Sequence, residues 1–166
     1  MRILLTGAHG FIGTALLKLK TGHDIIPANR GWIDHPNDVL WHNFDAVIHL
    51  AAAGVQGSDR EWDECMRVNF HALRAMLNSI SKSGATPIIY LAGSVLARDI
   101  VDELEKWANP YIVSKYLGSR FAFAWSRHHE YGSRLILDEL ENCYQPGKVE
   151  QTAEGIIKLV ESRINA

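Results

Sequence analysis

Several features that would assign this chain to a specialised class are scarce or missing in its 166 residues. Only two cysteines occur, Cys65 and Cys143, which is too few for a disulfide framework, so a reducing, cytoplasmic compartment is the default expectation. No apolar run approaches the ~20 residues that span a bilayer. The amino terminus does not resemble a signal peptide, because only Arg2 precedes the first apolar run and glycines follow at once. We therefore expect no association with a membrane.

Charge of one sign is also missing. The 17 Lys and Arg residues are scattered and balanced by 19 Asp and Glu residues, which gives a net charge of −2. No basic stripe indicates nucleic acid as a partner. The apolar fraction of 47% and the charged fraction of 22% are typical of a soluble globular protein, and the length suits one domain with a core.

The sequence contains eight histidines, but their pattern does not predict a metal site. His128 and His129 are adjacent, so they point to different faces of a helix, and no cysteine or carboxylate cluster joins them. His49 lies inside an apolar run, which is more typical of a hydrogen-bonded core residue. Cys65 follows two acidic neighbours, Asp63 and Glu64, which disfavour the thiolate, so we do not assign it as a nucleophile.

What is present is an alternation of short apolar runs with amphipathic segments. The apolar runs predict strands at 2–6, 23–29, 45–54, 87–94 and 133–139. The longer periodic segments predict helices at 11–20, 59–83, near 98–107, 110–130 and 150–164, with Thr152 as a candidate N-cap of the last. Residues 30–43 have room for at most a short helix. Strands that are apolar on both faces indicate a doubly wound parallel α/β sheet of Rossmann type, in a single domain over 1–166, with strand order 2-1-3-4-5.

Three glycines follow the first predicted strand at three-residue intervals, in "TGAHGFIG". Gly7 permits a tight turn, Gly10 leaves the backbone open to a pyrophosphate, and Gly13 allows close packing of the following helix. The amino terminus of that helix then presents free N–H groups and a partial positive charge to an anion. A glycine-rich turn without a ligand is the alternative, but its position between a strand and a helix favours a nucleotide site.

The end of the second predicted strand carries Asn29 and Arg30, with no carboxylate at either position. A carboxylate there would accept from a ribose 2′-hydroxyl, whereas Arg30 can pair with a 2′-phosphate. A solvated arginine in a turn is nearly as good an interpretation. NADP is therefore preferred modestly over NAD as the cofactor.

The segment "NPYIVSKYLG" places Tyr111 and Lys115 on one face of a helix. A nearby ammonium favours the phenolate, which suits a tyrosine to acid–base exchange with an alcohol or carbonyl. Ser94 ends the fourth predicted strand, where ligands bind in parallel sheets, and its hydroxyl can hold the substrate oxygen. Asn69, in "MRVNFHA", can anchor a water near Lys115, although a locally satisfied polar residue is the plainer interpretation.

Together, "TGAHGFIG", "DAVIHLAAAG", "VNFHA", the serine closing the fourth strand and "YIVSK" resemble the extended branch of the short-chain dehydrogenase/reductase superfamily, the NAD(P)-dependent epimerases, dehydratases and reductases. The resemblance covers about residues 1–147. It implies Ser94, Tyr111 and Lys115 as a catalytic triad supported by Asn69, with Lys115 also on the nicotinamide ribose. It implies a cofactor groove formed by Gly7, Gly10, Phe11, Ile12, Gly13, Asn29, Arg30, Leu50, Ala51 and Ala52.

The chain also departs from that family pattern. About fifteen residues remain where the family places a helix, a strand and another helix before "DAVIHLAA". Asp138 and Glu139 stand where the family has arginine and proline, and we expect no counterpart of the family's long substrate-binding segment. We expect an NAD(P)-dependent oxidoreductase or epimerase acting on a small molecule, with a non-catalytic dinucleotide-binding module as the alternative. The family also implies a homodimer built from the helices that hold Asn69 and Tyr111.

Overall fold

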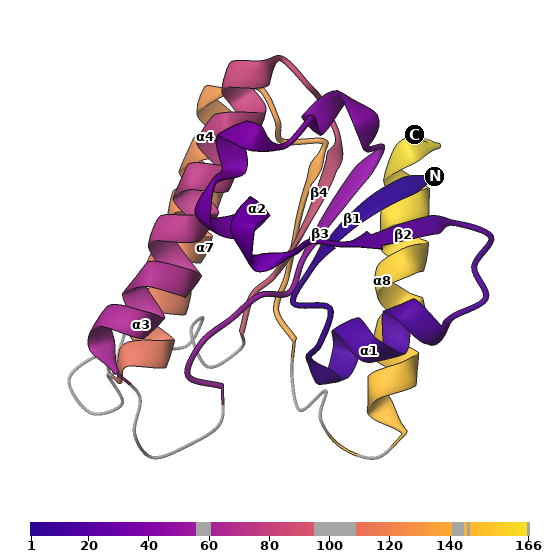
Figure 1. Ribbon diagram of the computed structural model, residues 1–166, viewed down its shortest axis with the longest axis horizontal. Helices are drawn as coiled ribbons and strands as arrows, with labels where there is room; N and C mark the ends of the chain where they lie inside the picture. Colours follow the sequence, from indigo (N-terminus) through magenta and orange to yellow (C-terminus); the bar gives the residue numbers. More distant parts are fainter. Residues whose placement is uncertain (56–60, 95–108, 141–144, 146, 166) are drawn as a thin grey trace.

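The computed structural model describes residues 1–55, 61–94, 109–140, 145 and 147–165. Its central feature is one sheet between two layers of helices (Figure 1). The short helix predicted near 98–107 lies outside the described residues. The two ends of the chain lie at the same end of the molecule, away from the carboxyl ends of the strands (Figure 1).

The sheet has five parallel strands in the order β2-β1-β3-β4-β5. The strands are β1 (Arg2–Thr6), β2 (Asp24–Pro27), β3 (Ala46–His49), β4 (Ile88–Ala92) and β5 (Leu135–Asp138). Leu4 pairs with Val47, Val47 with Ile89, and Ile89 with Leu135, so apolar residues line up across the sheet. The predicted fold class and strand order are confirmed. The order reverses beside β1, which leaves the carboxyl ends of β1 and β3 at the switch point where doubly wound sheets bind ligands.

Helices α1 (Phe11–Lys18) and α8 (Lys148–Ile164) cover one face of the sheet (Figure 1). Leu16 and Ile156 are fully buried in this layer, against Ile3 and Ile48 of the strands. At the side of α8, His23 Nε2 lies 2.9 Å from Glu161 Oε1, which ties the start of β2 to this helix.

The amino terminus of α8 differs from the prediction. The helix begins at Lys148, after Gly147 in a left-handed conformation with φ of 77°. Thr152 therefore lies inside the helix, and its prediction as the N-cap was wrong. Gly147 has no side chain to cap the helix. The helix begins after it because glycine readily adopts the positive φ of this position.

The opposite face is covered by a longer helical stack (Figure 1). It consists of α3 (Trp62–Met66), the π-helical segment η3 (Arg67–Ala72), α4 (Leu73–Ser83) and α7 (Pro110–His128). The predicted helix over 59–83 is thus present from Trp62, but it contains a π-helical turn. It ends, as predicted, at Gly84, whose φ is 73°.

Three short helical turns fill the region where the sequence left little room. They are α2 (Arg30–Asp34), η1 (Pro36–Asp38) and η2 (Trp41–Asn43). Trp41 is buried, and its Nε1 donates to Ser79 Oγ of α4 at 2.9 Å. This compact segment packs beside α4.

Candidate functional site

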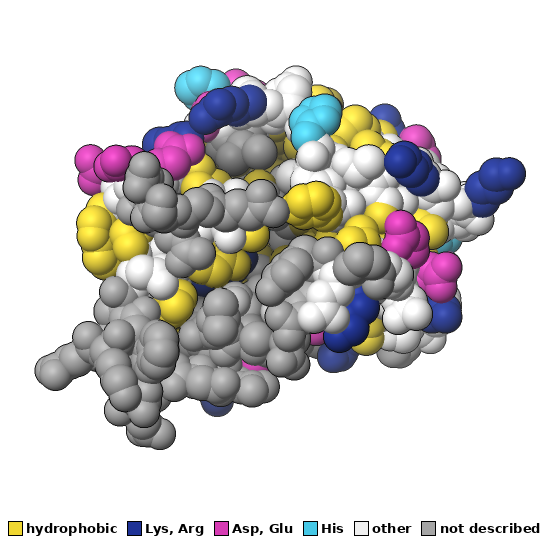
Figure 2. Space-filling view, turned by 90° about the horizontal axis from the view of Figure 1, so that it is seen from below, with side chains coloured by type: hydrophobic (Ala, Val, Ile, Leu, Met, Phe, Trp, Pro, Cys, Tyr) yellow, Lys and Arg dark blue, Asp and Glu magenta, His cyan; other side chains and the backbone are white. Residues whose placement is uncertain are grey.

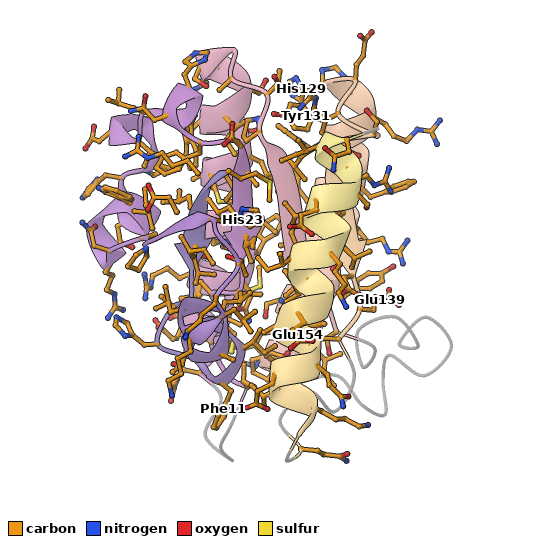
Figure 3. The ribbon with its side chains drawn as sticks, turned by 90° about the vertical axis from the view of Figure 1, so that its right-hand side faces the viewer. Phe11, His23, His129, Tyr131, Glu139 and Glu154 are labelled. Carbon is orange, nitrogen blue, oxygen red and sulfur yellow. The ribbon has the colours of Figure 1, made fainter. Side chains whose placement is uncertain are left out.

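The predicted site residues gather along the carboxyl edge of the sheet, at the lower end of Figure 1. Figure 2 looks onto this end, where apolar side chains are visible between charged ones that lie mostly toward the rim. Figure 3 shows Phe11 at this end and His129 and Tyr131 at the opposite end. Phe11 is 60% exposed, an unusual position for a large apolar side chain.

The glycine turn between β1 and α1 requires its glycines. Gly7 has a φ of 71°, and a Cβ at this position would lie 2.7 Å from Ala51 N. A Cβ on Gly13 would lie 2.2 Å from Gly7 O, so the helix packs directly on the turn. Gly10 is exposed, and among the described atoms only Gly7 O lies within 4 Å of the place of its Cβ. The close contacts at Gly7 and Gly13 thus explain why neither position can carry a side chain. At Gly10 the missing side chain leaves room on the outer side of the turn.

The first turn of α1 provides the polar part of this place. Gly10 caps the helix without a side-chain bond, and no acidic residue lies in the first turn. Thr14 N donates to Gly10 O at 2.9 Å, which is the first backbone bond of the helix. The preceding N–H groups of Phe11, Ile12 and Gly13 are the usual orphan donors of a helix start. They give this turn the character of an anion site.

The turn after β3 forms the neighbouring wall. Leu50, Ala51 and Ala52 are partly exposed there, and the backbone of Leu50 and Ala51 adjoins Gly7. Ala51 N donates to Thr6 Oγ1 at 3.2 Å. Ala53 N donates to Asn69 Oδ1 at 2.8 Å, and Asn69 Nδ2 donates back to Ala53 O at 3.0 Å. Side chains from β1 and η3 therefore fix the backbone of this turn.

Asn29 and Arg30 lie at the carboxyl end of β2, on the same edge as Gly7. Both are exposed. The side chain of Asn29 caps α2, since its Oδ1 accepts from Trp32 N at 3.0 Å. That bond occupies only the Asn29 carbonyl, so Asn29 Nδ2 can still donate. Arg30 is nevertheless the better candidate of the two for contact with a bound phosphate, because its guanidinium is charged.

Helix α7 carries Tyr111 and Lys115, and Asn109 caps its amino terminus by accepting from Ile112 N at 3.0 Å. Tyr111 is half-buried and Lys115 is buried. Lys115 Nζ donates to Ala92 O, at the last residue of β4 and two positions before the buried Ser94. The structure thus brings Lys115 next to the strand end that carries Ser94.

Burial affects the charge of this lysine. Desolvation lowers the pKa of Lys115 from 10.5 to about 8, so the ammonium is still the main form near neutral pH. The neighbouring His49 is also buried, and burial together with the charge of Lys115 lowers its pKa from 6.5 to about 3. His49 is therefore neutral, and Lys115 is the cation of this part of the site.

His49 itself is a hydrogen-bonded core residue, as the sequence indicated. Its Nδ1 lies 2.8 Å from Thr6 Oγ1, which joins the ends of β3 and β1. Because Thr6 Oγ1 also accepts from Ala51 N, this pair braces the turn that faces the glycines. Sequence reasoning did not single out Thr6, although it is the only polar residue besides Arg2 in its strand.

Asn69 lies in the π-helical turn and is buried, with both ends of its amide engaged. Besides Ala53, its Nδ2 donates to Ser114 Oγ at 2.9 Å. A cavity of about 10 Å³ adjoins His49, Asn69 and Lys115, a size that suits about one water molecule. Ser114 was missed by sequence reasoning, although it directly precedes Lys115 in "YIVSK".

Other kinds of site find little support in the described part of the chain. It holds no group of three or more His, Cys, Asp or Glu side chains that could bind a metal ion. None of its helices combines the length and apolar character required to cross a membrane. The dinucleotide-type edge is therefore the candidate that the geometry favours.

Solved structures with the same fold include several dinucleotide-binding proteins. The dTDP-4-dehydrorhamnose reductase of Bacillus anthracis, in complex with NADP, matches with a TM-score of 0.69 at 20% identity, over 96% of this chain and 70% of that one. RMD from Pseudomonas aeruginosa, complexed with NADPH, matches with a TM-score of 0.65 at 22% identity, over 83% of this chain and 52% of that one. A short-chain dehydrogenase/reductase from Brucella ovis matches with a TM-score of 0.66 at 18% identity, over 96% of this chain and 92% of that one. These likenesses show the fold.

The chain spans about half the length of RMD and of MoeE5, a protein solved with UDP-glucose and NAD. No curated protein matches its sequence significantly. The model of the NAD dependent epimerase/dehydratase family, however, matches residues 3–166. The resemblance stated from the sequence is confirmed, and the chain belongs to the NAD-dependent epimerase/dehydratase family.

Proposed function

We propose that this protein is an NAD(P)-dependent oxidoreductase or epimerase that acts on a carbonyl or alcohol group of a sugar nucleotide or a related small molecule. The observation that carries the proposal is the position of Lys115, which shares a helix with Tyr111 and bonds to the end of β4 beside Ser94. This cation lies on the same edge of the sheet as the glycine turn, so the proposed dinucleotide site and the proposed acid–base tyrosine would adjoin.

The residues present fit a nicotinamide dinucleotide. The open side of Gly10 and the free N–H groups of the first turn of α1 suit the pyrophosphate, with Phe11, Ile12 and Gly13 on the helix side. Leu50, Ala51 and Ala52 would line the groove, and Asn29 and Arg30 would meet the adenosine ribose. The exposed Arg30 and the missing carboxylate favour NADP over NAD.

A bound nicotinamide supplies or accepts the hydride. The chain's own part is to hold the substrate oxygen and to move one proton. Ser94 Oγ would bind that oxygen, and Tyr111 Oη would give the proton to it or take the proton from it. Lys115 favours the tyrosinate through its charge, because a cation stabilises a nearby anion in a site of low dielectric constant. Asn69 would support this arrangement through η3.

We also propose that the protein is a single domain over 1–166, that it forms a homodimer through the helices that hold Asn69 and Tyr111, and that it is cytoplasmic. The exposed Trp62 and Phe123, at 51% and 52%, are compatible with contact through that helical layer. Light scattering at micromolar concentration tests the dimer, and a monomer would contradict it.

The proposed chemistry is tested with Tyr111→Phe. Titration of the protein with NADPH and with NADH measures cofactor binding. NADPH oxidation with dTDP-4-dehydrorhamnose, and interconversion of UDP-glucose and UDP-galactose, measure turnover. We expect Tyr111→Phe to lower kcat by about 100-fold or more and to leave the Kd for NADPH within about twofold, because only the proton donor is lost. Tyr116→Phe on the same helix is the matched control and should keep full activity.

A non-catalytic dinucleotide-binding module is the second candidate. The departure from the family pattern at Asp138 favours it. This carboxylate accepts from Tyr90 Oη at 2.6 Å, at the place where the family resemblance leads one to expect arginine. NADPH binding without turnover of any of these sugar nucleotides would support the module. Failure to bind either dinucleotide would contradict both candidates.

A further inference from the structure

Ser114 has no role in the proposed chemistry, yet it lies between the two residues that do. It directly precedes Lys115 in α7 and is 0% exposed. A serine at a buried helical position is unfavourable unless its hydroxyl is used, because buried polar groups must be hydrogen-bonded. The hydroxyl of Ser114 forms two hydrogen bonds.

One bond is local and the other is long-range. Ser114 Oγ donates to Tyr111 O at 3.0 Å, in the first turn of α7. The same oxygen accepts from Asn69 Nδ2 at 2.9 Å, across the gap between α7 and η3. Ser114 thus connects the backbone of Tyr111 to the side chain of Asn69.

Asn69 carries the connection onward to the proposed cofactor groove. Its amide forms two bonds with the backbone of Ala53, at 2.8 Å and 3.0 Å. Ala53 follows Ala51 and Ala52, which we assign to the groove wall. A continuous chain of hydrogen bonds therefore runs from the groove wall through Asn69 and Ser114 to the backbone of Tyr111.

The packing around this chain leaves it little freedom. A Cβ on Gly118 would lie 2.6 Å from Asn69 O, so the backbones of α7 and η3 are in direct contact one turn further along. Lys115 Nζ anchors α7 to the end of β4 as well. The amino-terminal part of α7 is consequently held to β4 by Lys115 and to the turn after β3 by Ser114.

We propose that Ser114 is a positioning residue that sets the place of Tyr111 relative to the groove wall by accepting the hydrogen bond of Asn69. The catalytic meaning of that position rests on the proposed function. The positioning itself is a property of the protein without ligand. Loss of the Ser114 hydroxyl should let the first turn of α7 shift, while Lys115 still ties the helix to β4.

Ser114→Ala removes only the hydroxyl, and alanine is a good helix former. One N–H of Asn69 Nδ2 keeps Ala53 O as its acceptor, whereas the N–H that bonded to Ser114 Oγ loses its partner. Ser126→Ala is the matched control. Ser126 is buried in the same helix, and its Oγ makes the same kind of bond to Phe123 O at 2.8 Å, a contact that lies wholly within α7. Ser114→Cys is a second variant whose thiol fills the site but bonds weakly.

The primary measurement is made on the protein without ligand. Tyrosine labelled with ¹³C at Cζ gives one NMR signal for each of the five tyrosines, and Tyr111→Phe identifies the Tyr111 signal. We expect Ser114→Ala and Ser114→Cys to move the Tyr111 signal and the Ala53 amide signal together, and Ser126→Ala to move neither. An unmoved Tyr111 signal in Ser114→Ala, or an equal movement in Ser126→Ala, would overturn the proposal.

Activity provides the second measurement. With NADPH and dTDP-4-dehydrorhamnose, Ser114→Ala should lower kcat by about tenfold and leave KM and the Kd for NADPH within about twofold, as expected for a displaced acid–base group. If the protein neither binds NADPH nor turns over, the proposed function fails and the NMR signals still decide the positioning. If turnover is found with an unmoved Tyr111 signal, the positioning alone fails.

Discussion

The two helical layers of this protein pack on the same sheet but differ in what they bury. The buried residues of α1 and α8 are apolar or glycine. The opposite layer buries polar and charged side chains as well. Among the described residues the buried polar ones are Thr6, His49, Asn69, Ser79, Ser94, Ser114, Lys115 and Ser126, and none belongs to α1 or α8.

Alternation along the strands produces this difference. Thr6 and His49 follow Leu4 and Val47 at two-residue intervals, so they face the layer of α4 and α7 with these core residues. The layer of α1 and α8 meets Ile3, Leu5 and Ile48 instead. The layer of α1 and α8 therefore buries apolar groups, and the other layer adds buried polar groups, of which Thr6, His49 and Lys115 lie near the carboxyl edge. The comparison predicts that substitutions on the two sides have different consequences.

The largest expected loss of stability comes from substitution of buried apolar residues, and it should be equal in the two helical layers. Ile156→Ala in α8 and Ile80→Ala in α4 each remove a side chain that is at most 1% exposed. Each should lower the free energy of unfolding by about 3 kcal/mol, through lost burial and a residual cavity. Urea denaturation measures this, with Leu159→Ala, 41% exposed on α8, as the control expected below about 1 kcal/mol. A much smaller loss for Ile80→Ala would mean that polar bonds hold its layer.

The sequence predicted the apolar side of this comparison well. Short runs such as "RILLT" and "IIYLA" are buried strands, and their order follows from the right-handed crossover. The glycine turn was also predictable, since Gly7 and Gly13 meet backbone that leaves no room for a Cβ. These features depend on local pattern, which a single sequence contains.

The polar side was less predictable, because its contacts join residues far apart in the chain. The sequence indicated Asn69 and Lys115 but not their partners, the Ala53 backbone with Ser114 and the Ala92 carbonyl. The π-helical turn around Asn69 was not predicted either, because helical periodicity does not distinguish a π turn within a longer helix. The proposed placement of Tyr111 beside Ser94 stays a prediction.

The next largest effect is a pH dependence of stability that comes from the buried charge of Lys115. Its pKa is about 8 in the folded protein and 10.5 as the reference, so unfolding takes up a proton between these values. The free energy of unfolding should therefore rise with pH through this window. From about pH 7.5 to about pH 9.5 the gain is about 2 kcal/mol for wild type relative to Lys115→Met. Urea denaturation of both proteins at both pH values measures it, and parallel pH profiles would show that Lys115 is not desolvated.

A smaller effect of the same origin is expected on the acid side, from His49. Its pKa of about 3 lies below the reference of 6.5, so the stability it contributes is present above 6.5 and is lost as the pH falls. Between about pH 7.5 and about pH 5.5 wild type should lose about 1 kcal/mol relative to His49→Gln. Denaturation at the two pH values measures the difference. His128→Gln, at an exposed position of α7, is the control and should follow wild type.

The smallest effect is expected from polar groups of the same layer that are not buried. Arg67 joins η3 to α2 through Asp34 Oδ1 at 3.3 Å and pairs with Glu64 Oε2 at 2.9 Å. All three side chains are at least 40% exposed, so water already solvates the charges. Arg67→Ala should lower the free energy of unfolding by about 0.5 kcal/mol, less in high salt, and Asp34→Asn by no more. A loss above about 2 kcal/mol in urea denaturation would show that this ion pair supports the fold, and that the polar character of the layer stabilises it at the surface as well as in the interior.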